Sequence, residues 1–292
     1  MGKKKRARGI KWVEPILYLL PALIYFTIFS FYPFIKTVIS TFFTVNANGE
    51  VKAFAGLGNY IHVLTDTLFL KSIVNTLIYV VLASPVAIAI ALILAVLASK
   101  KTRTSSIYET MFALTMAMSM SVTAMIFKIM YNPNIGIINK ILGVKINWLN
   151  DPKYAMVSMS MISVWMNIGF NFLFLLAAIR GVPGDLLESA EMDGASLYRK
   201  VRSIILPIIS PTVFFLICNS LAKNIIMAGL PIILTEGGPK GSTTTMIYYM
   251  YKQAFSNMSY NDAYAAAVLT FLLSFAAILL SFAFEKKGVH YS

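Results

Sequence analysis

GDLLESAEMDGAS, at Gly184–Ser196, places four acidic residues within nine positions of a 292-residue chain that holds only 12 acidic residues. The chain as a whole is 58% hydrophobic and only 13% charged. A soluble domain averages about 25% charged residues, so this chain lacks the polar surface that water would require on all sides. The acidic stretch is therefore expected to be a polar loop between membrane-embedded segments.

Long runs without a charged residue lie on both sides of that loop. Each run has 18 or more residues, which is enough for a helix to cross a hydrocarbon core about 30 Å thick. The six runs are Pro15–Ile35, Ser72–Ser99, Thr110–Phe127, Tyr154–Ile179, Ser203–Ala222 and Ala263–Phe284. Because lipid cannot satisfy backbone polar groups, helices are the expected form, and the sequence predicts an all-α membrane protein with six transmembrane helices. The second run carries small residues at every fourth position, a pattern typical of close helix packing: Ala83, Ala87, Ala91, Ala95 and Ser99.

The basic residues predict which way the chain faces. If both termini lie in the cytoplasm, 15 of the 25 basic residues fall on cytoplasmic segments, as the positive-inside rule requires. The net charge of +13 is then explained by topology, and the KKKRAR run at Lys3–Arg8 is interpreted as an anchor that touches anionic lipid rather than nucleic acid. We expect a basic cytoplasmic tail of residues 1–14 and a single membrane domain of residues 15–292.

The acidic loop has the local signals of two short helices. Asp185 followed by Glu188 has the spacing of an N-cap with an acid at the third helical position. Gly194 suits the left-handed residue that often follows a helix, and Ser196 can cap a second helix. Pro207 is expected to start the next span. Residues 181–207 thus predict a small helix–turn–helix at the cytoplasmic surface that docks into a pocket of another protein.

No constellation for catalysis or energy coupling is evident elsewhere. The sequence contains no H-E-x-x-H, G-x-S-x-G or Cys/His cluster, so no catalytic or metal site is predicted. GGPKGST at Gly237–Thr243 has the wrong order for a phosphate loop, and none of the six apolar runs holds a carboxylate for ion coupling. Cys218 is expected to be a buried small hydrophobe. If the chain transports a solute, a partner must supply the energy.

The fifth run carries polar residues on one side of the expected helix, at positions i, i+1, i+4 and i+5. They are Asn219, Ser220, Lys223 and Asn224, and the fourth run adds Asn167 and Asn171. Polar groups in a membrane are costly unless they face protein or a water-filled cavity. Two interpretations carry equal weight here: a wall of a solute pathway, or hydrogen bonding between helices.

The stretch ESAEMDGASLYRKVRSIILP, Glu188–Pro207, resembles the EAA loop of ABC-importer permeases. Eight positions are in register with that motif: Glu188, Ala190, Asp193, Gly194, Ala195, Ile204, Leu206 and Pro207. Ser189 and Val201 depart from it, and Val201 replaces the usual aromatic residue. Stretches such as FAGLGNY, VWMNIGFNFLFLLAAIRGVP and LTEGGPKGSTTTMIYYMY look similar to the carbohydrate branch of these permeases.

That resemblance implies a six-helix permease core in a bacterial-type cell membrane. It also implies four kinds of partner or cofactor: a second related permease subunit, two cytoplasmic ATPase subunits, ATP and Mg on those ATPases rather than on this chain, and an external solute-binding protein. The positions it assigns to ATPase coupling are Glu188, Ala190, Asp193, Gly194, Ala195, Leu206 and Pro207. The solute is expected to be an oligosaccharide or sugar derivative, with glycerol-3-phosphate as the alternative. A self-sufficient carrier or channel is the competing class.

Overall fold

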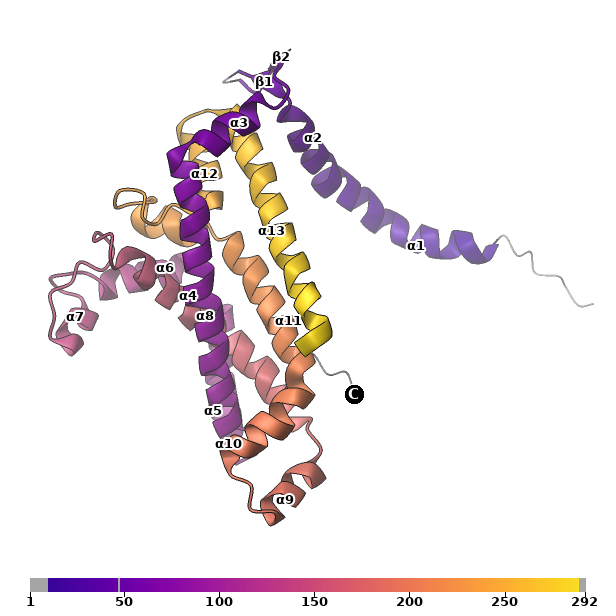
Figure 1. The fold of residues 1–292 in the computed structure, drawn as a ribbon, viewed down its shortest axis with the longest axis vertical. Coiled ribbons are helices and arrows are strands. Elements are labelled where there is room, and N and C mark those ends of the chain that lie inside the picture. The colour runs from indigo at the N-terminus through magenta and orange to yellow at the C-terminus, as the bar shows by residue number, and fades with distance from the viewer. Residues whose placement is uncertain (1–9, 47, 289–292) are drawn as a thin grey trace, which may run out of the picture.

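A computed structural model of the protein describes residues 10–46 and 48–288. Helices dominate these residues, and several long ones run side by side as a bundle (Figure 1). They are α1 (Ile10–Phe26), α2 (Tyr32–Ser40), α3 (Gly58–Thr65), α4 (Thr67–Leu97), α5 (Ser105–Ala117), α6 (Met120–Met130), α7 (Ile137–Leu142), α8 (Ala155–Arg180), α9 (Gly184–Met192), α10 (Leu197–Lys200), α11 (Leu206–Ile225), α12 (Met246–Tyr251) and α13 (Tyr260–Gly288). Strands β1 (Phe43–Val45) and β2 (Val51–Phe54) pair antiparallel, with Phe43 opposite Phe54. The predicted helical membrane class is confirmed, and the small β-hairpin is an addition to it.

Five helical stretches among the described residues are long and apolar enough to cross a membrane. They are Pro15–Ser40, Thr67–Leu97, Ala155–Arg180, Leu197–Ile225 and Tyr260–Ala283. Five of the six predicted runs coincide with these stretches. A sixth span exists if the bent pair of α5 and α6 is counted as one.

The third predicted run is not a straight helix. It is broken between α5 and α6, whose axes differ by 100°. Met118 and Ser119 at the break have extended backbone conformations, and the Ser119 hydroxyl accepts a hydrogen bond from the Val122 amide at 3.2 Å. Serine is among the preferred residues at a helix N-cap, so Ser119 starts a new helix in the middle of the apolar run.

The core of the bundle forms where α4 packs against α8. The four alanines of the predicted strip, Ala83, Ala87, Ala91 and Ala95, are all buried, which confirms that this face of α4 is in close contact with neighbouring helices. Near the α9 end, Ala91 and Ala95 belong to one apolar cluster with Phe172 and Leu175 of α8 and Leu216 of α11. Small side chains let the helix backbones approach closely, as membrane helices require when the hydrophobic effect does not drive their association.

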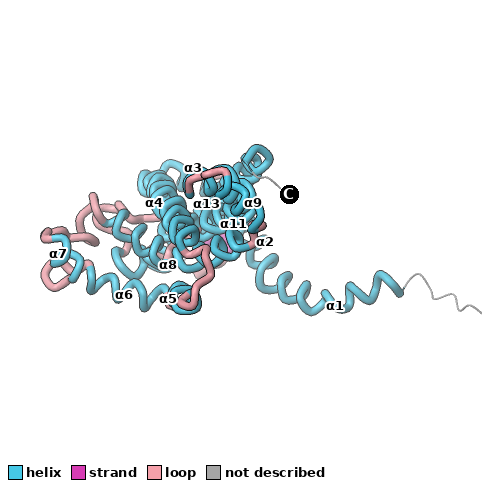
Figure 2. Tube along the Cα trace, turned by 90° about the horizontal axis from the view of Figure 1, so that it is seen from below, coloured by secondary structure: helices cyan, strands magenta, loops and turns pink. Residues whose placement is uncertain are grey.

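The first span leaves this bundle. Two perpendicular views show α1 leading away from the other helices (Figures 1 and 2). The side chains of residues 15–36 are exposed in the isolated chain, as Phe29 is at 65%. The span touches the bundle through α2, where the rings of Phe34 and Phe271 lie 5.0 Å apart between centroids. The predicted lipid anchor at Lys3–Arg8 lies outside the described residues, and the division at residue 14 remains a prediction.

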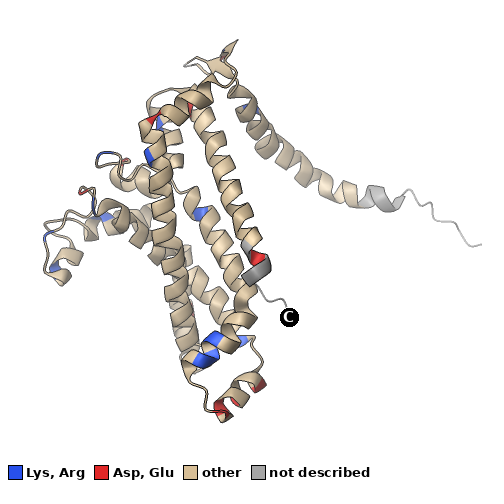
Figure 3. Cartoon of the chain, in the orientation of Figure 1, with Lys and Arg blue, Asp and Glu red and all other residues tan. Residues whose placement is uncertain are grey.

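The two ends of the bundle differ in structure and charge. The β-hairpin, α3 and α12 gather at one end, and α9 and α10 form the other (Figure 1). Acidic residues mark α9 and basic residues mark α10 (Figure 3). The acidic loop therefore lies at the end of the bundle opposite the β-hairpin. Which end faces the cytoplasm stays a prediction from the charge pattern.

Candidate functional site

The stretch from α9 to α10 is a helical hairpin joined by a Schellman turn. The Gly194 amide donates to the Glu191 carbonyl at 3.0 Å, and the Ala195 amide donates to the Ala190 carbonyl at 2.9 Å. These are the two bonds that define the motif when the residue after the helix is left-handed, and Gly194 has φ of +71°. The predicted left-handed glycine is therefore confirmed.

One of the two predicted caps is correct. The Ser196 hydroxyl accepts from the Arg199 amide at 3.4 Å, so Ser196 caps the second helix as expected. The prediction that Asp185 caps the first helix is wrong, because Pro183 occupies the N-cap position and makes no side-chain cap bond. Asp185 lies inside the first turn instead, where a carboxylate interacts favourably with the positive end of the helix dipole.

The second arm of the hairpin is continuous with the fifth span. The prediction that Pro207 starts that span is wrong, since the helical stretch runs from Leu197 to Ile225. A π-helical segment at Val201–Ile205 lies just before Leu206 and Pro207 and widens the helix there. Pro207 cannot donate to the preceding turn, and local widening is one way in which membrane helices accommodate a proline.

The charged residues of the hairpin hold its arms together and leave the acidic face exposed. Lys200 and Glu191 form an ion pair at 2.7 Å across the turn, and the hydrogen bond from Lys200 holds the pKa of Glu191 below its ordinary value. Glu188 and Asp193 are exposed. Asp193 lines a hollow of about 290 Å³ with Ala190, Ala195, Arg199, Lys200, Ser203 and Ile204. Of the seven predicted coupling positions, Ala190, Asp193 and Ala195 share this hollow, whereas Glu188 lines a different hollow of about 330 Å³. Gly194 forms the turn, and Leu206 and Pro207 lie one helical segment away.

The apolar residues of the hairpin fall into two groups. Leu187 and Ile204 pack against the apolar cluster of the bundle, so they fix the hairpin to the helices above it. Met192 is 89% exposed and Tyr198 is 69% exposed at the tip. No residue of α9 is fully buried. An exposed tip with both apolar and acidic side chains is suited to contact another protein rather than to pack within this chain.

Arg180, at the end of α8, ties three helices together just before the hairpin. Its guanidinium forms an ion pair with Glu109 of α5 at 2.8 Å and donates to the Ser99 carbonyl, beyond the end of α4, at 3.3 Å. The sequence alone does not indicate this ion pair, because Glu109 lies 71 positions from Arg180.

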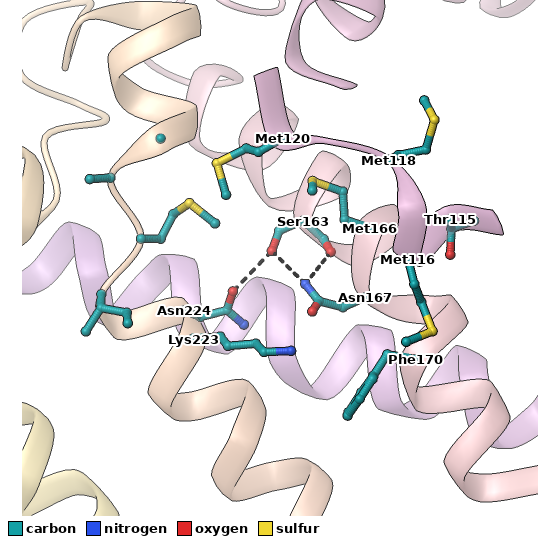
Figure 4. Close-up of a pocket in the computed structure, with 14 residues that line it drawn as sticks. Thr115, Met116, Met118, Met120, Ser163, Met166, Asn167, Phe170, Lys223 and Asn224 are labelled. Atoms are coloured by element: carbon teal, nitrogen blue, oxygen red, sulfur yellow. Dashed lines mark hydrogen bonds between the residues drawn. The ribbon is translucent and has the colours of Figure 1, made fainter. Parts of the chain in front are cut away.

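A second candidate site is an open cavity of about 520 Å³ between helices of the bundle. Its walls come from α8, from α11 and the chain after it, and from the break between α5 and α6 (Figure 4). Methionines form much of the wall: Met116, Met118, Met120, Met166 and Met227. The break that hydropathy could not predict thus supplies part of this cavity.

A chain of hydrogen bonds crosses the cavity wall. Ser163 donates to the Asn224 side-chain carbonyl at 3.1 Å, and Asn167 donates to the Ser163 backbone carbonyl at 2.8 Å (Figure 4). Asn224 also donates to the hydroxyl of Ser84, at 2.8 Å. Asn224 therefore links α4, α8 and α11, which is the helix-bonding interpretation of that residue.

The six predicted pathway residues divide into two sets. Asn167, Lys223 and Asn224 line the cavity, whereas Asn219, Ser220 and Asn171 do not. Ser220 and Asn171 are buried, and the side-chain nitrogen of Asn171 has no hydrogen-bond partner among the described residues. Helical spacing placed these residues on one side of each helix but could not say which neighbour each would meet. A role in solute passage remains a prediction for all six.

Residues 68–287 match the family model described as "Binding-protein-dependent transport system inner membrane component". The chain is 32% identical over 283 residues to the sn-glycerol-3-phosphate transport system permease protein UgpA of Agrobacterium fabrum, covering 96% of this chain and 97% of that protein. It is also 32% identical to the protein of that name from Yersinia pestis, over the full length of both. A solved bacterial alginate ABC transporter, in complex with an alginate pentasaccharide-bound periplasmic protein, has a chain of similar fold, with a TM-score of 0.82, 22% identity and 96% coverage of both chains.

Proposed function

The chain belongs to the family of binding-protein-dependent transport system inner membrane components, and from that premise we propose that it is the membrane permease subunit through which an ATP-driven importer moves a carbohydrate. Its solute is an oligosaccharide or sugar derivative, delivered by an external binding protein. The chain has no ATPase site of its own, and partner subunits hold ATP and Mg. The observation that carries this proposal is the exposed α9–α10 hairpin, rigid at its turn and continuous with a span.

The hairpin is the part of the chain that contacts an ATPase subunit. Three features support this role: an exposed tip, exposed carboxylates at Glu188 and Asp193, and a turn fixed by two backbone hydrogen bonds. A partner that pushes on α9 moves a body that includes α10, because the Lys200–Glu191 ion pair joins the two arms. The fifth span follows α10 without a break in the helix, so the force has a direct route into the membrane domain.

The other partners follow from surfaces that the isolated chain leaves uncovered. A second, related permease subunit covers the exposed apolar side chains of residues 15–36, while the end of α2 packs against α13 and β1 of this chain. A solute-binding protein docks at the end that carries the β-hairpin, α3 and α12. The protein is a multi-pass component of the inner membrane with both termini in the cytoplasm.

The second candidate solute is glycerol-3-phosphate. Relatives that match this chain over nearly their whole length carry that solute in their names. The solved transporter of similar fold is named for alginate, an acidic polysaccharide. Both solutes are rich in hydroxyl groups and carry negative charge, so they share the chemistry that the cavity must meet.

A self-sufficient carrier or channel is the competing class, and it predicts uptake by this chain alone. Among its lining residues the cavity has no carboxylate that could bind a coupling proton or sodium ion. In vesicles that contain the chain without its ATPases, we expect no uptake of solute with or without ATP.

Site-specific cross-linking tests the docking role directly. In the assembled complex, with Cys218→Ala as background, Met192→Cys should cross-link to an ATPase subunit. Val51→Cys is the matched control, since it is also exposed but lies on the β-hairpin at the opposite end of the bundle. Deletion of Leu187–Ala195 should abolish solute-stimulated ATP hydrolysis and uptake. Retained activity in that deletion, or a cross-link from Val51→Cys in place of Met192→Cys, would overturn the proposal.

A further inference from the structure

The open cavity between α5, α8 and α11 has a single charged side chain among its lining residues, Lys223. Its ammonium nitrogen lies 4.5 Å from the centroid of the Phe170 ring, in a cation–π contact. No described acidic residue forms an ion pair with it: the salt bridges of the described chain join His62, Arg180 and Lys200 to their carboxylates. The Lys223 side chain is exposed at the cavity wall in the isolated chain, and it has no counter-charge among the described residues. Ionisable residues in a membrane span are costly unless they face protein or a water-filled cavity, so this lysine is a candidate functional residue.

The direction of the Lys223 side chain places its ammonium group at the cavity rather than at the end of α11. A lysine near the end of a membrane helix ordinarily extends toward the nearer water interface. Lys223 is two residues from the end of α11 at Ile225, and its neighbour Asn224 contacts Ser163 on α8. Phe170 lies seven residues further along α8, about 10 Å away at 1.5 Å per residue. Lys223 therefore points away from the end of its own helix and toward the middle of α8.

The polar groups around Lys223 leave specific hydrogen-bonding capacity. Both ends of the Asn224 amide are used, by Ser163 and Ser84. The Asn167 nitrogen is used by Ser163, but its side-chain oxygen accepts no hydrogen bond from the described residues. Lys223 and Asn167 both line this cavity, from α11 and α8 respectively (Figure 4). The cavity wall thus offers an ammonium donor and an amide acceptor, with an aromatic ring in contact with the ammonium.

We propose that this cavity binds the anionic group of a hydroxyl-bearing solute, with Lys223 receiving a phosphate or carboxylate and the Asn167 oxygen accepting from a solute hydroxyl. The Phe170 ring holds the ammonium in place when the cavity is empty. Methionines at 116, 118 and 166 provide a flexible wall that can adapt to solutes of different length. This inference rests on the proposed transport function and narrows its solute from carbohydrates in general to those that carry a negative charge.

Direct binding to the assembled complex tests this assignment without selection by the external binding protein. The probes are radiolabelled sn-glycerol 3-phosphate, an alginate trisaccharide, and two neutral counterparts, glycerol and maltotriose. The variants are Lys223→Gln, Lys223→Arg and the control Lys128→Gln, which removes an exposed charge on α6 that does not line the cavity. Each is reconstituted in lipid nanodiscs with its partner subunits.

We expect the wild-type complex to bind at least one anionic probe more tightly than its neutral counterpart. Lys223→Gln should weaken that binding by about tenfold or more, because a charge-assisted hydrogen bond is lost. Lys223→Arg should stay within about threefold of wild type, and Lys128→Gln should have no effect. Tighter binding of sn-glycerol 3-phosphate would show that the site accepts a phosphate, and tighter binding of the alginate trisaccharide would show that it accepts a carboxylate.

Two results would overturn the assignment. One is a wild-type complex that binds only neutral probes, and the other is a Lys223→Gln complex that loses neutral and anionic probes equally. The proposed function fails in a different way. If the complex binds anions at Lys223 but shows no ATP-dependent uptake of any probe, the binding site stands and the importer function is refuted. If ATP-driven uptake occurs but is the same in wild type and Lys223→Gln, the importer function stands and the binding site is refuted.

Discussion

Replacement of Gly194 by alanine tests whether the shape of the hairpin turn matters for transport. Gly194 has φ of +71°, and a Cβ added there would meet no heavy atom within 4 Å. The substitution therefore introduces backbone strain without a steric clash. A left-handed conformation costs a residue with a Cβ about 1–2 kcal/mol, so the native turn should lose about 5- to 30-fold in population relative to other conformations of the loop.

That loss should be felt in coupling rather than in the stability of the whole chain. No residue of α9 is fully buried, so the position of α9 depends on the turn, on Leu187 and on the Glu191–Lys200 ion pair. In proteoliposomes that contain the complete transporter, Gly194→Ala should lower solute-stimulated ATP hydrolysis and uptake together by several-fold. The midpoint of thermal unfolding of the complex should stay near that of wild type.

Gly194→Asn is the matched control, because asparagine tolerates the left-handed region better than alanine does. We expect activity to fall in the order Gly, Asn, Ala. Gly194→Asp then separates strain from docking, since it is nearly isosteric with Asn but adds a negative charge. Loss in the Asp variant beyond that in the Asn variant would place the effect in the partner contact. If Ala and Asn variants match wild type, or lose activity equally, the argument from backbone strain is refuted.

Two stability predictions concern the helices above the hairpin. Arg180→Met should lower the free energy of unfolding by about 1–3 kcal/mol in detergent, because Glu109 loses its half-buried ion-pair partner. Arg180→Lys should fall between wild type and Arg180→Met. Equal free energies of unfolding for all three proteins would contradict the role of the ion pair. Gly169→Ala should destabilise by about 1–3 kcal/mol because the new Cβ would overlap the Phe112 carbonyl of α5, whereas Gly184→Ala has free space and should be neutral; equal effects in thermal melts would contradict the close approach of α5 and α8.

Hydropathy predicted most of the membrane fold because each span must be apolar regardless of what it packs against. It failed for the third span, since an 18-residue run does not show whether the helix within it is continuous. Ser119 is the local signal for the break, but it lies among methionines and other small residues that fit either interpretation. Only the tertiary structure shows that the break borders a cavity.

Within the hairpin, the sequence predicted the features that follow from backbone conformation. It missed the residue at which the first helix begins, because neighbouring residues compete for the N-cap position. Gly194 and Ser196 are correct because a left-handed turn and an N-cap each need particular residue types. Asp185 has the right side chain for a cap, but Pro183 is the residue at which the helix begins.

In the membrane domain, the limit was long-range pairing. Helical spacing grouped Lys223 and Asn224 correctly, yet the partner of Asn224 on α4 is Ser84, 140 positions earlier in the chain. Ser163 was overlooked as a polar residue of the cavity wall because a single serine in an apolar run carries no pattern. The ion pair of Arg180 with Glu109 escaped notice for the same reason.

The two candidate sites are connected by the simplest route that the chain allows. The hairpin lies between α8 and α11, and these same two helices supply the polar wall of the cavity, with Asn167 on one and Lys223 on the other. The helical stretch from Leu197 to Ile225 is about 43 Å long at 1.5 Å per residue, so it runs from the turn to the cavity as one element. We infer that a displacement of the hairpin by a partner changes the distance between Lys223 and Asn167 without any intermediate relay. If this helical stretch bent under load, the π-helical segment at Val201–Ile205 is where it would bend and absorb the displacement. An importer that works in this way needs no charged residue between its hairpin and its solute, and the described part of α11 before Lys223 has none.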